Sequence, residues 1–171
     1  MSSFTRKWVR QKTRAGTVYR PFIDLLFSEK TGYNVYSFIV DSGADVSLAP
    51  RQLAERIGLD WIKGSRVTLT GISPKPECSL EGRIHKVTVL IPDIEFELSL
   101  PICFANGNAP YLVGREGFFD EFDITLEKQK RRTIFNAVGR NSNSRKWLFL
   151  NARRERGSFY TEWDLMTLIP V

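Results

Sequence analysis

Short segments rich in β-branched and aromatic residues, separated by turn-forming residues, recur along most of this chain and restrict its fold. Several of them alternate apolar and polar side chains, a period of two that is typical of strands with one buried face. The predicted strands cover residues 17–27, 33–40, 65–70, 84–90, 94–104 and 124–126. Helical patterns occur only at residues 50–57, with Gly58 just past their end, and at residues 115–122. The sequence therefore predicts an all-β barrel or sandwich with one or two short helices.

Length and composition exclude several classes of protein. With 171 residues, 42% of them hydrophobic, the chain is long enough for one domain with a buried core and too short for two large ones. It has no apolar run of the ~18 residues that a membrane span needs, and its basic, polar start differs from a secretory signal. We therefore expect no membrane partner and a cytoplasmic location. Two cysteines and one histidine are too few for a zinc site or a disulfide framework, so no metal and no cofactor are predicted.

The net charge of +6 is distributed unevenly along the chain. Residues 1–20 carry six basic groups and no acidic one, and residues 128–171 carry ten basic and three acidic groups. The middle, residues 21–127, has nine basic and sixteen acidic groups, a net charge of −7. Basic ends on an acidic body fit interaction tails at least as well as a nucleic-acid surface.

One segment has a pattern that suits a catalytic site. The apolar strand that ends at Val40 runs directly into Asp41, Ser42, Gly43 and Ala44. A carboxylate at the end of a buried strand is costly unless its neighbours satisfy it or its charge is used. The small residues after it let the backbone turn tightly and approach another backbone or a substrate. For these four residues alone, an ordinary strand-to-turn exit is the simpler interpretation.

The wider context resembles the retropepsin-like aspartic proteases, the family of the retroviral proteases and their bacterial single-domain relatives. The segment 41–44 is similar to the catalytic signature of that family, and the segment 111–115 (Tyr-Leu-Val-Gly-Arg) is similar to its second signature. Gly71 and Ile72, between two alternating strands, stand where the family has its flap hairpin. The loop at 73–79 departs from retroviral flap tips because it is rich in proline and poor in glycine.

The resemblance covers residues 17–136 and divides the chain into three parts. We expect a basic N-terminal arm at 1–16, a retropepsin-like domain at 17–136 and a basic, aromatic C-terminal extension at 137–171. The polar stretch 137–144 is the best candidate for a linker.

The resemblance also implies roles for individual residues. Asp41 would be the catalytic residue of a closed, retropepsin-like barrel, while Gly71 and Ile72 in the flap would cover the bound peptide. Asp45 and Arg115 match positions that pair in the family. Support of the active-site loop is expected from Ser42, Gly43, Ala44, Asp45, Gly114 and Arg115.

Aspartic-protease chemistry uses two carboxylates that face one water, and this chain has one aspartate followed by Ser-Gly or Thr-Gly. We therefore predict a symmetric homodimer in which each chain contributes Asp41. The two carboxyl groups would share one proton, so that one activates the water and the other polarises the scissile carbonyl. The predicted function is an aspartic endopeptidase that hydrolyses peptides or unfolded proteins bound in an extended conformation.

Two alternatives remain open at this point. One is a catalytically silent retropepsin-like module that binds peptides or mediates dimerisation. The other is a nucleic-acid-associated adaptor, since the basic runs 128–132 and 153–156 are interleaved with aromatic residues. For these two runs we favour a simpler interpretation over nucleic-acid binding, namely a solvated strand face and a tail that docks on the protein. A nucleophilic pair of Cys78 and His85 has no orienting Asn or Asp, so an ordinary thiol and a surface histidine are favoured.

Overall fold

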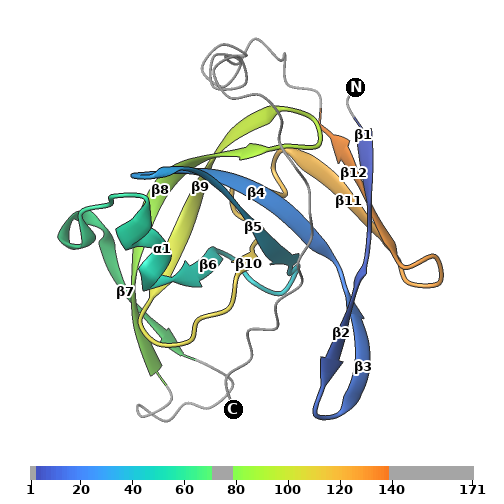
Figure 1. Cartoon of the computed structure of the whole chain (residues 1–171), viewed down its shortest axis with the longest axis horizontal. Helices are drawn as coiled ribbons and strands as arrows, with labels where there is room; N and C mark the ends of the chain where they lie inside the picture. Colours follow the sequence, from blue (N-terminus) through green and yellow to red (C-terminus); the bar gives the residue numbers. More distant parts are fainter. Residues whose placement is uncertain (1–2, 71–78, 139–171) are drawn as a thin grey trace.

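Strands dominate residues 3–70 and 79–138, which are the residues that the computed structural model describes (Figure 1). The strands are β1 (Ser3–Lys7), β2 (Val9–Thr13), β3 (Gly16–Arg20), β4 (Phe22–Glu29), β5 (Gly32–Val40), β6 (Ser47–Pro50), β7 (Ser65–Thr70), β8 (Ser79–Ile91), β9 (Phe96–Ala105), β10 (Leu112–Val113), β11 (Phe122–Glu127) and β12 (Arg132–Ala137). The helical elements are α1 (Arg51–Arg56) and the 3-10 turn η1 (Trp61–Lys63). The all-β prediction is confirmed.

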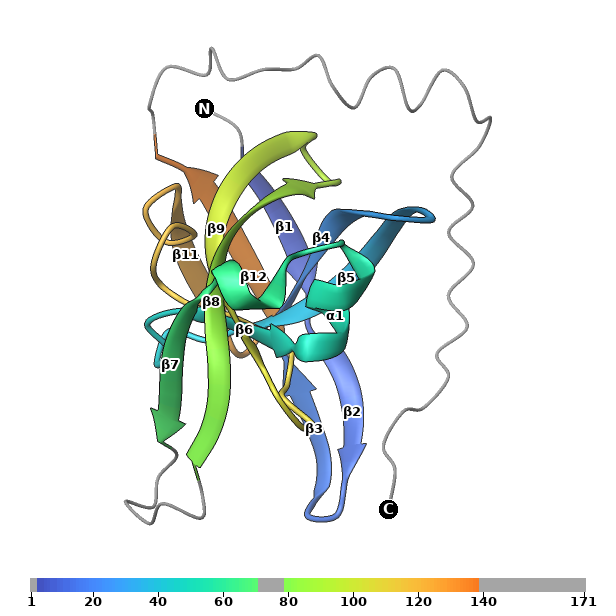
Figure 2. The same cartoon turned by 90° about the vertical axis from the view of Figure 1, so that its left-hand side faces the viewer.

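Six of the strands close into a barrel, in the order β4-β5-β10-β6-β9-β8. The barrel closes because β4 also pairs with β8, with Leu26 opposite Leu90. Strand β7 extends the sheet beyond β8, and Figure 2 shows these two long strands running side by side. Most pairs are antiparallel, but β10 is parallel to β5 and β6 is parallel to β9. These two parallel pairings position the chain segments that form the site described below.

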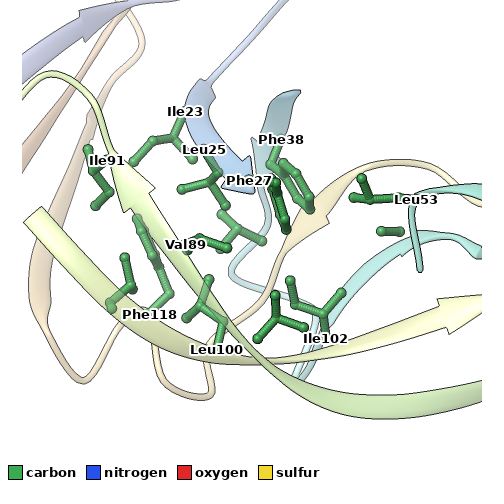
Figure 3. Packing of buried hydrophobic residues seen from close by; sticks show 14 of the residues in the cluster. Ile23, Leu25, Phe27, Phe38, Leu53, Val89, Ile91, Leu100, Ile102 and Phe118 are labelled. Carbon is green, nitrogen blue, oxygen red and sulfur yellow. The ribbon is translucent and has the colours of Figure 1, made fainter. Parts of the chain in front are cut away.

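The barrel is filled by aliphatic and aromatic side chains from all its long strands (Figure 3). Strand β4 contributes Ile23, Leu25 and Phe27, each fully buried, and β9 contributes Leu100 and Ile102 from the opposite wall. Because side chains alternate across a strand, every second residue of β4 and β9 points into the barrel. The alternating apolar pattern of the sequence thus becomes the core.

A second sheet, β1-β12-β11, packs beside the barrel through an aromatic cluster. The ring of Phe4 stacks on Phe135 with centroids 4.6 Å apart, and Phe122 meets Phe4 edge-on at 6.0 Å. Arg6 of β1 bridges the two sheets, because it donates to Asp24 of the barrel at 2.7 Å. Part of the expected N-terminal arm is therefore a strand of this sheet; the three-part division of the chain stays a prediction.

Two local predictions are wrong, each because of one residue. The expected strand at 17–27 is divided at Pro21, which has no N–H to donate to a ladder, so β3 ends at Arg20 and β4 begins at Phe22. The expected helix at 115–122 is a series of turns. Gly117 has a φ of +79°, which lies outside the helical region, so no helix continues through it. The helix expected at 50–57 is α1, and Gly58 follows it with a φ of +76°.

Candidate active site

Asp41 lies where β5 leaves the barrel. Its backbone N–H donates to the carbonyl of Val113 at 3.0 Å, one step beyond the ladder in which Val40 is opposite Val113. Because β5 and β10 are parallel, their carboxyl ends lie at the same edge of the sheet. The two segments that the sequence marks, 41–45 and 111–115, are therefore neighbours in space, although about seventy residues separate them along the chain.

The carboxylate of Asp41 is half-buried and held by its own turn. Its Oδ1 accepts a hydrogen bond from the backbone N–H of Gly43 at 2.9 Å, and its carbonyl accepts from the N–H of Ala44 at 3.3 Å. Ser42 and Gly43 are exposed beside it. A Cβ at Gly43 would lie 3.2 Å from Asp41 Oδ1, so glycine keeps the surroundings of the carboxylate open. The turn thus orients the carboxylate and leaves it accessible.

The loop after β10 braces the Asp41 turn through backbone hydrogen bonds. The N–H of Arg115 donates to the carbonyl of Ala44 at 2.9 Å, and the N–H of Glu116 donates to the carbonyl of Asp45 at 2.8 Å. The N–H of Gly114 donates to Ser47 Oγ at 3.1 Å, in a buried position. Three consecutive donors of one loop therefore fix the other loop in place.

Gly114 must be a glycine because the two loops touch there. A Cβ built at this residue would lie 2.6 Å from the carbonyl carbon of Val46 and 2.9 Å from the N of Ser47. Both contacts are with backbone, which cannot move aside as the end of a flexible side chain would. The glycine at position 114 is thereby explained by the close approach of two backbones.

Asp45 and Arg115 form an ion pair across the two loops, from Arg115 Nη2 to Asp45 Oδ1. Both side chains are largely exposed, at 78% and 57% respectively. An exposed pair contributes little to stability on its own, with typical values of about 0.2–1 kcal/mol. The structure therefore brings together the two residues that the family resemblance pairs, while their role stays a prediction.

Three residues named in the sequence analysis lie outside the described residues. They are Gly71 and Ile72 of the expected flap, and Cys78. His85, the possible partner of Cys78, lies on β8 opposite Ile102. Cys103 is a buried free thiol on β9. Burial raises the pKa of the Cys103 thiol, which disfavours the nucleophilic thiolate.

Sequence reasoning assigned no role to two residues that hold the site together. Ser47 is fully buried and supplies the acceptor for Gly114. Its signal was a lone hydroxyl at the start of an otherwise apolar strand. Tyr111 was recognised only as the first residue of the segment 111–115. Its carbonyl accepts from Ile39 N–H at 2.9 Å, and its ring stacks on Tyr36 with centroids 5.4 Å apart. Both residues fix the segment that precedes Gly114.

A cavity among the described residues lies away from the Asp41 turn. Its volume is about 570 Å³, and its lining residues come from β8, β9 and the turns before β11. None of them belongs to residues 41–47 or 111–116. This cavity is therefore separate from the Asp41 turn. Within 3–70 and 79–138, no group of three or more His, Cys, Asp or Glu side chains is placed to hold a metal ion, and no helix there has the length and apolarity to span a membrane.

A retropepsin-like aspartic protease from Rickettsia conorii has a similar solved structure. The TM-score is 0.51 with 16% identical residues, and the match covers 78% of this chain and 98% of that one. The fold is retropepsin-like. The predicted fold class is confirmed at this level, because such a low identity supports the retropepsin-like architecture alone. No protein-family model matches the sequence, and no curated protein does.

Proposed function

We propose that this chain is an aspartic endopeptidase of the retropepsin-like family and that it acts as a homodimer. The observation that carries the proposal is the Asp41 turn: a half-buried carboxylate, oriented by Gly43, lies in a loop that a second loop braces with three hydrogen bonds. A general base needs such a fixed orientation and access to water. The retropepsin-like fold and its similarity to the Rickettsia conorii protease support this reading.

The dimer follows from the chemistry, since one carboxylate cannot serve as base and acid in the same step. Asp45, the nearest other acid in the loop, is engaged by Arg115. A second copy related by a two-fold axis would supply the partner carboxylate. The ionised aspartate would take a proton from water, whose oxygen attacks the peptide carbonyl, and the protonated aspartate would donate to the carbonyl oxygen. Collapse of the tetrahedral species then breaks the C–N bond and returns a proton to the leaving amine.

Substrate would bind as an extended strand, and residues of the Asp41 turn would contact its backbone. Ser42 would donate across the two-fold axis and brace the two active loops against each other. Gly43 is exposed and has no side chain, so a peptide backbone can approach it closely. Ala44, Gly114 and the pair of Asp45 with Arg115 would keep the turn in place. Gly71 and Ile72 are proposed to cover the bound peptide.

The test compares wild-type protein with Asp41→Asn on unfolded casein at mildly acidic to neutral pH. The substitution keeps the size of the side chain and removes its charge, and we expect cleavage to fall by at least about 10³-fold. Asp123→Asn, at an exposed position on β11, is the matched control and should cleave as the wild type does. Cleavage that survives in Asp41→Asn would exclude this mechanism. Peptide binding without cleavage by the wild type would indicate the catalytically silent module.

A mixing experiment tests whether two chains share one site. Wild-type and Asp41→Asn chains are unfolded together, refolded at varied ratios and assayed at constant total concentration. If both copies of Asp41 are needed, activity falls with the square of the wild-type fraction. A linear fall, or an active species that sediments as a monomer, would contradict the homodimer.

A further inference from the structure

Strands β2 and β3 form a two-stranded ribbon that is separate from both sheets. Val9 is opposite Arg20 at its base and Thr13 is opposite Gly16 at its tip. In the part of the chain that the structure describes, the two strands pair only with each other. Figures 1 and 2 both show the ribbon projecting away from the barrel. Because the ribbon is not part of either sheet, pairing within the sheets does not explain its sequence.

The ribbon is strongly basic. Residues 9–20 include Arg10, Lys12, Arg14 and Arg20, all exposed, and no acidic residue. Arg131, from the turn between β11 and β12, lies against the same ribbon, with its Cζ 3.7 Å from the ring centroid of Tyr19. Its carbonyl accepts from the backbone N–H of Trp8 at 2.7 Å, which fixes the turn beside the base of the ribbon.

These cations are not used to neutralise carboxylates within the described residues. Several other basic side chains do neutralise carboxylates. Each of these contacts an Asp or Glu: Arg6, Arg51, Arg66, Arg115 and Arg132. No ion pair joins Arg10, Lys12 or Arg131 to an acid of residues 3–70 or 79–138. Like charges held close together repel, and a bound polyanion removes that cost.

Arg10, Lys12 and Arg131 share one face of the ribbon. Residues opposite each other in a ladder point to the same side, and Arg10 is opposite Tyr19 while Lys12 is opposite Thr17. Arg131 covers the ring of Tyr19 and so lies on this face too. Along β2 the two cations are about 7 Å apart, two residues of an extended strand. The face thus presents a row of cations with a hydroxyl beside it.

We propose that this face binds nucleic acid through its phosphate backbone. An acidic protein segment fits less well, because the face offers Arg10, Lys12, Thr17 and Tyr19 but no aliphatic side chain, whereas protein interfaces bury an apolar centre. Protein–nucleic acid interfaces are more polar and more positive. Arg, Lys and Thr are common phosphate ligands, and the major groove of duplex DNA admits a two-stranded β-ribbon. This binding is independent of peptide hydrolysis.

The experiment measures fluorescence anisotropy of a labelled duplex DNA, a single-stranded DNA and a single-stranded RNA with the full chain over a range of salt. The three cations of this face predict a plot of log K against log[salt] with a slope of about −2 to −3. Arg10→Gln/Lys12→Gln should bind at least about tenfold more weakly, with a slope smaller in magnitude by about 2. Arg10→Lys/Lys12→Arg keeps both charges and should retain binding. Lys30→Gln/Lys63→Gln removes the same charge far from the ribbon and should bind as the wild type does.

Three outcomes would overturn the proposal. One is that the wild type binds none of the oligonucleotides at low salt. Another is that Arg10→Gln/Lys12→Gln loses no more affinity than the Lys30→Gln/Lys63→Gln control, which would place binding in a different basic segment. The third is that poly-glutamate competes as well as the oligonucleotides, which would indicate an acidic protein partner. Cleavage of casein by all three variants at the wild-type rate would separate this result from the proposed protease activity.

Discussion

Gly114 and Ser47, 67 residues apart in the chain, are joined by a buried hydrogen bond of 3.1 Å from the backbone N–H of the glycine to the Oγ of the serine. Strand β6 begins at Ser47, and β10 ends one residue before Gly114. The bond therefore links Gly114, just after β10, to the first residue of β6, the strand that follows the Asp41 turn. Its loss would affect the Asp41 turn, although neither residue touches the carboxylate.

Ser47→Ala should lower the free energy of unfolding by about 1–3 kcal/mol, because it leaves the Gly114 N–H buried without an acceptor. Urea denaturation of the isolated protein measures the change. Ser99→Ala, at an exposed position on β9, is the control and should change stability by less than about 0.5 kcal/mol. Equal effects of the two substitutions would show that the bond adds nothing to stability.

Gly114→Ala and Gly43→Ala should separate folding from activity. At Gly114 the new Cβ meets backbone atoms at 2.6–2.9 Å, so we expect a loss of about 2 kcal/mol or more in unfolding free energy. At Gly43 the Cβ meets Asp41 Oδ1 at 3.2 Å, which displaces the carboxylate by a few tenths of an ångström. Gly43→Ala should therefore fold with near wild-type stability and cleave casein more slowly. Full activity in Gly43→Ala would show that the position of the carboxylate tolerates this displacement.

Asp45 and Arg115 should show weak coupling, since both side chains are more than half exposed. A double-mutant cycle with Asp45→Asn and Arg115→Gln, read from urea denaturation at low protein concentration, should give less than about 1 kcal/mol. If the homodimer buries this pair, the coupling should grow when the cycle is repeated at concentrations that favour the dimer. A coupling energy well above that value at the low concentration would mean that the loops of the single chain depend on this ion pair.

Much of the barrel could be predicted from local pattern. The strand predicted at 65–70 has the bounds of β7, and the helix ends where Gly58 adopts its left-handed backbone, because alternation and glycine punctuation are local signals. Strands β1 and β12 were missed, since their basic and polar residues hide the apolar alternation of Phe4 and Phe135. Their pairing is a long-range contact that no short window contains.

The site divides in the same way. Asp41 was identifiable because the segments 41–44 and 111–115 together resemble the two signatures of one family, and each signature is a local pattern. Ser47 was not, because its partner Gly114 is brought near only by the parallel pairing of β10 with β5. Sequence reasoning therefore finds the candidate catalytic carboxylate more readily than the residues that hold it in place.

Arg6 should be a strong point of attachment between β1 and the barrel. Its Nη2 lies 2.7 Å from both Asp24 and Asp93, and Asp24, only 5% exposed, also accepts from Ser37 Oγ at 2.5 Å. Arg6→Met would leave the buried carboxylate of Asp24 without its cation, and we expect a loss of about 3 kcal/mol in unfolding free energy.

Two comparisons make the Arg6 prediction specific. Arg66→Met breaks the exposed pair with Glu81 and should cost less than about 1 kcal/mol. Arg6→Met/Asp24→Leu removes both charges and should be more stable than Arg6→Met alone, because no buried charge is left unpaired. If the single and double variants unfold at the same urea concentration, the carboxylate of Asp24 is not the source of the cost.

Tyr36 and Tyr111 should make the protein less stable at alkaline pH. Burial raises the pKa of both phenols above their ordinary value of 10.0, and at Tyr36 the hydrogen bond to Glu29 adds to the effect of burial. Below that pH both phenols are protonated in the folded and in the unfolded protein, so they do not make the free energy of unfolding depend on pH. Above it the unfolded chain loses these protons before the folded chain does, so the unfolded state is favoured increasingly as pH rises. Urea denaturation as a function of pH should show this decline, and the variant Tyr36→Phe/Tyr111→Phe should show a shallower one. An unchanged slope in that variant would assign the alkaline decline to other groups, such as the buried thiol of Cys103, whose raised pKa acts in the same direction.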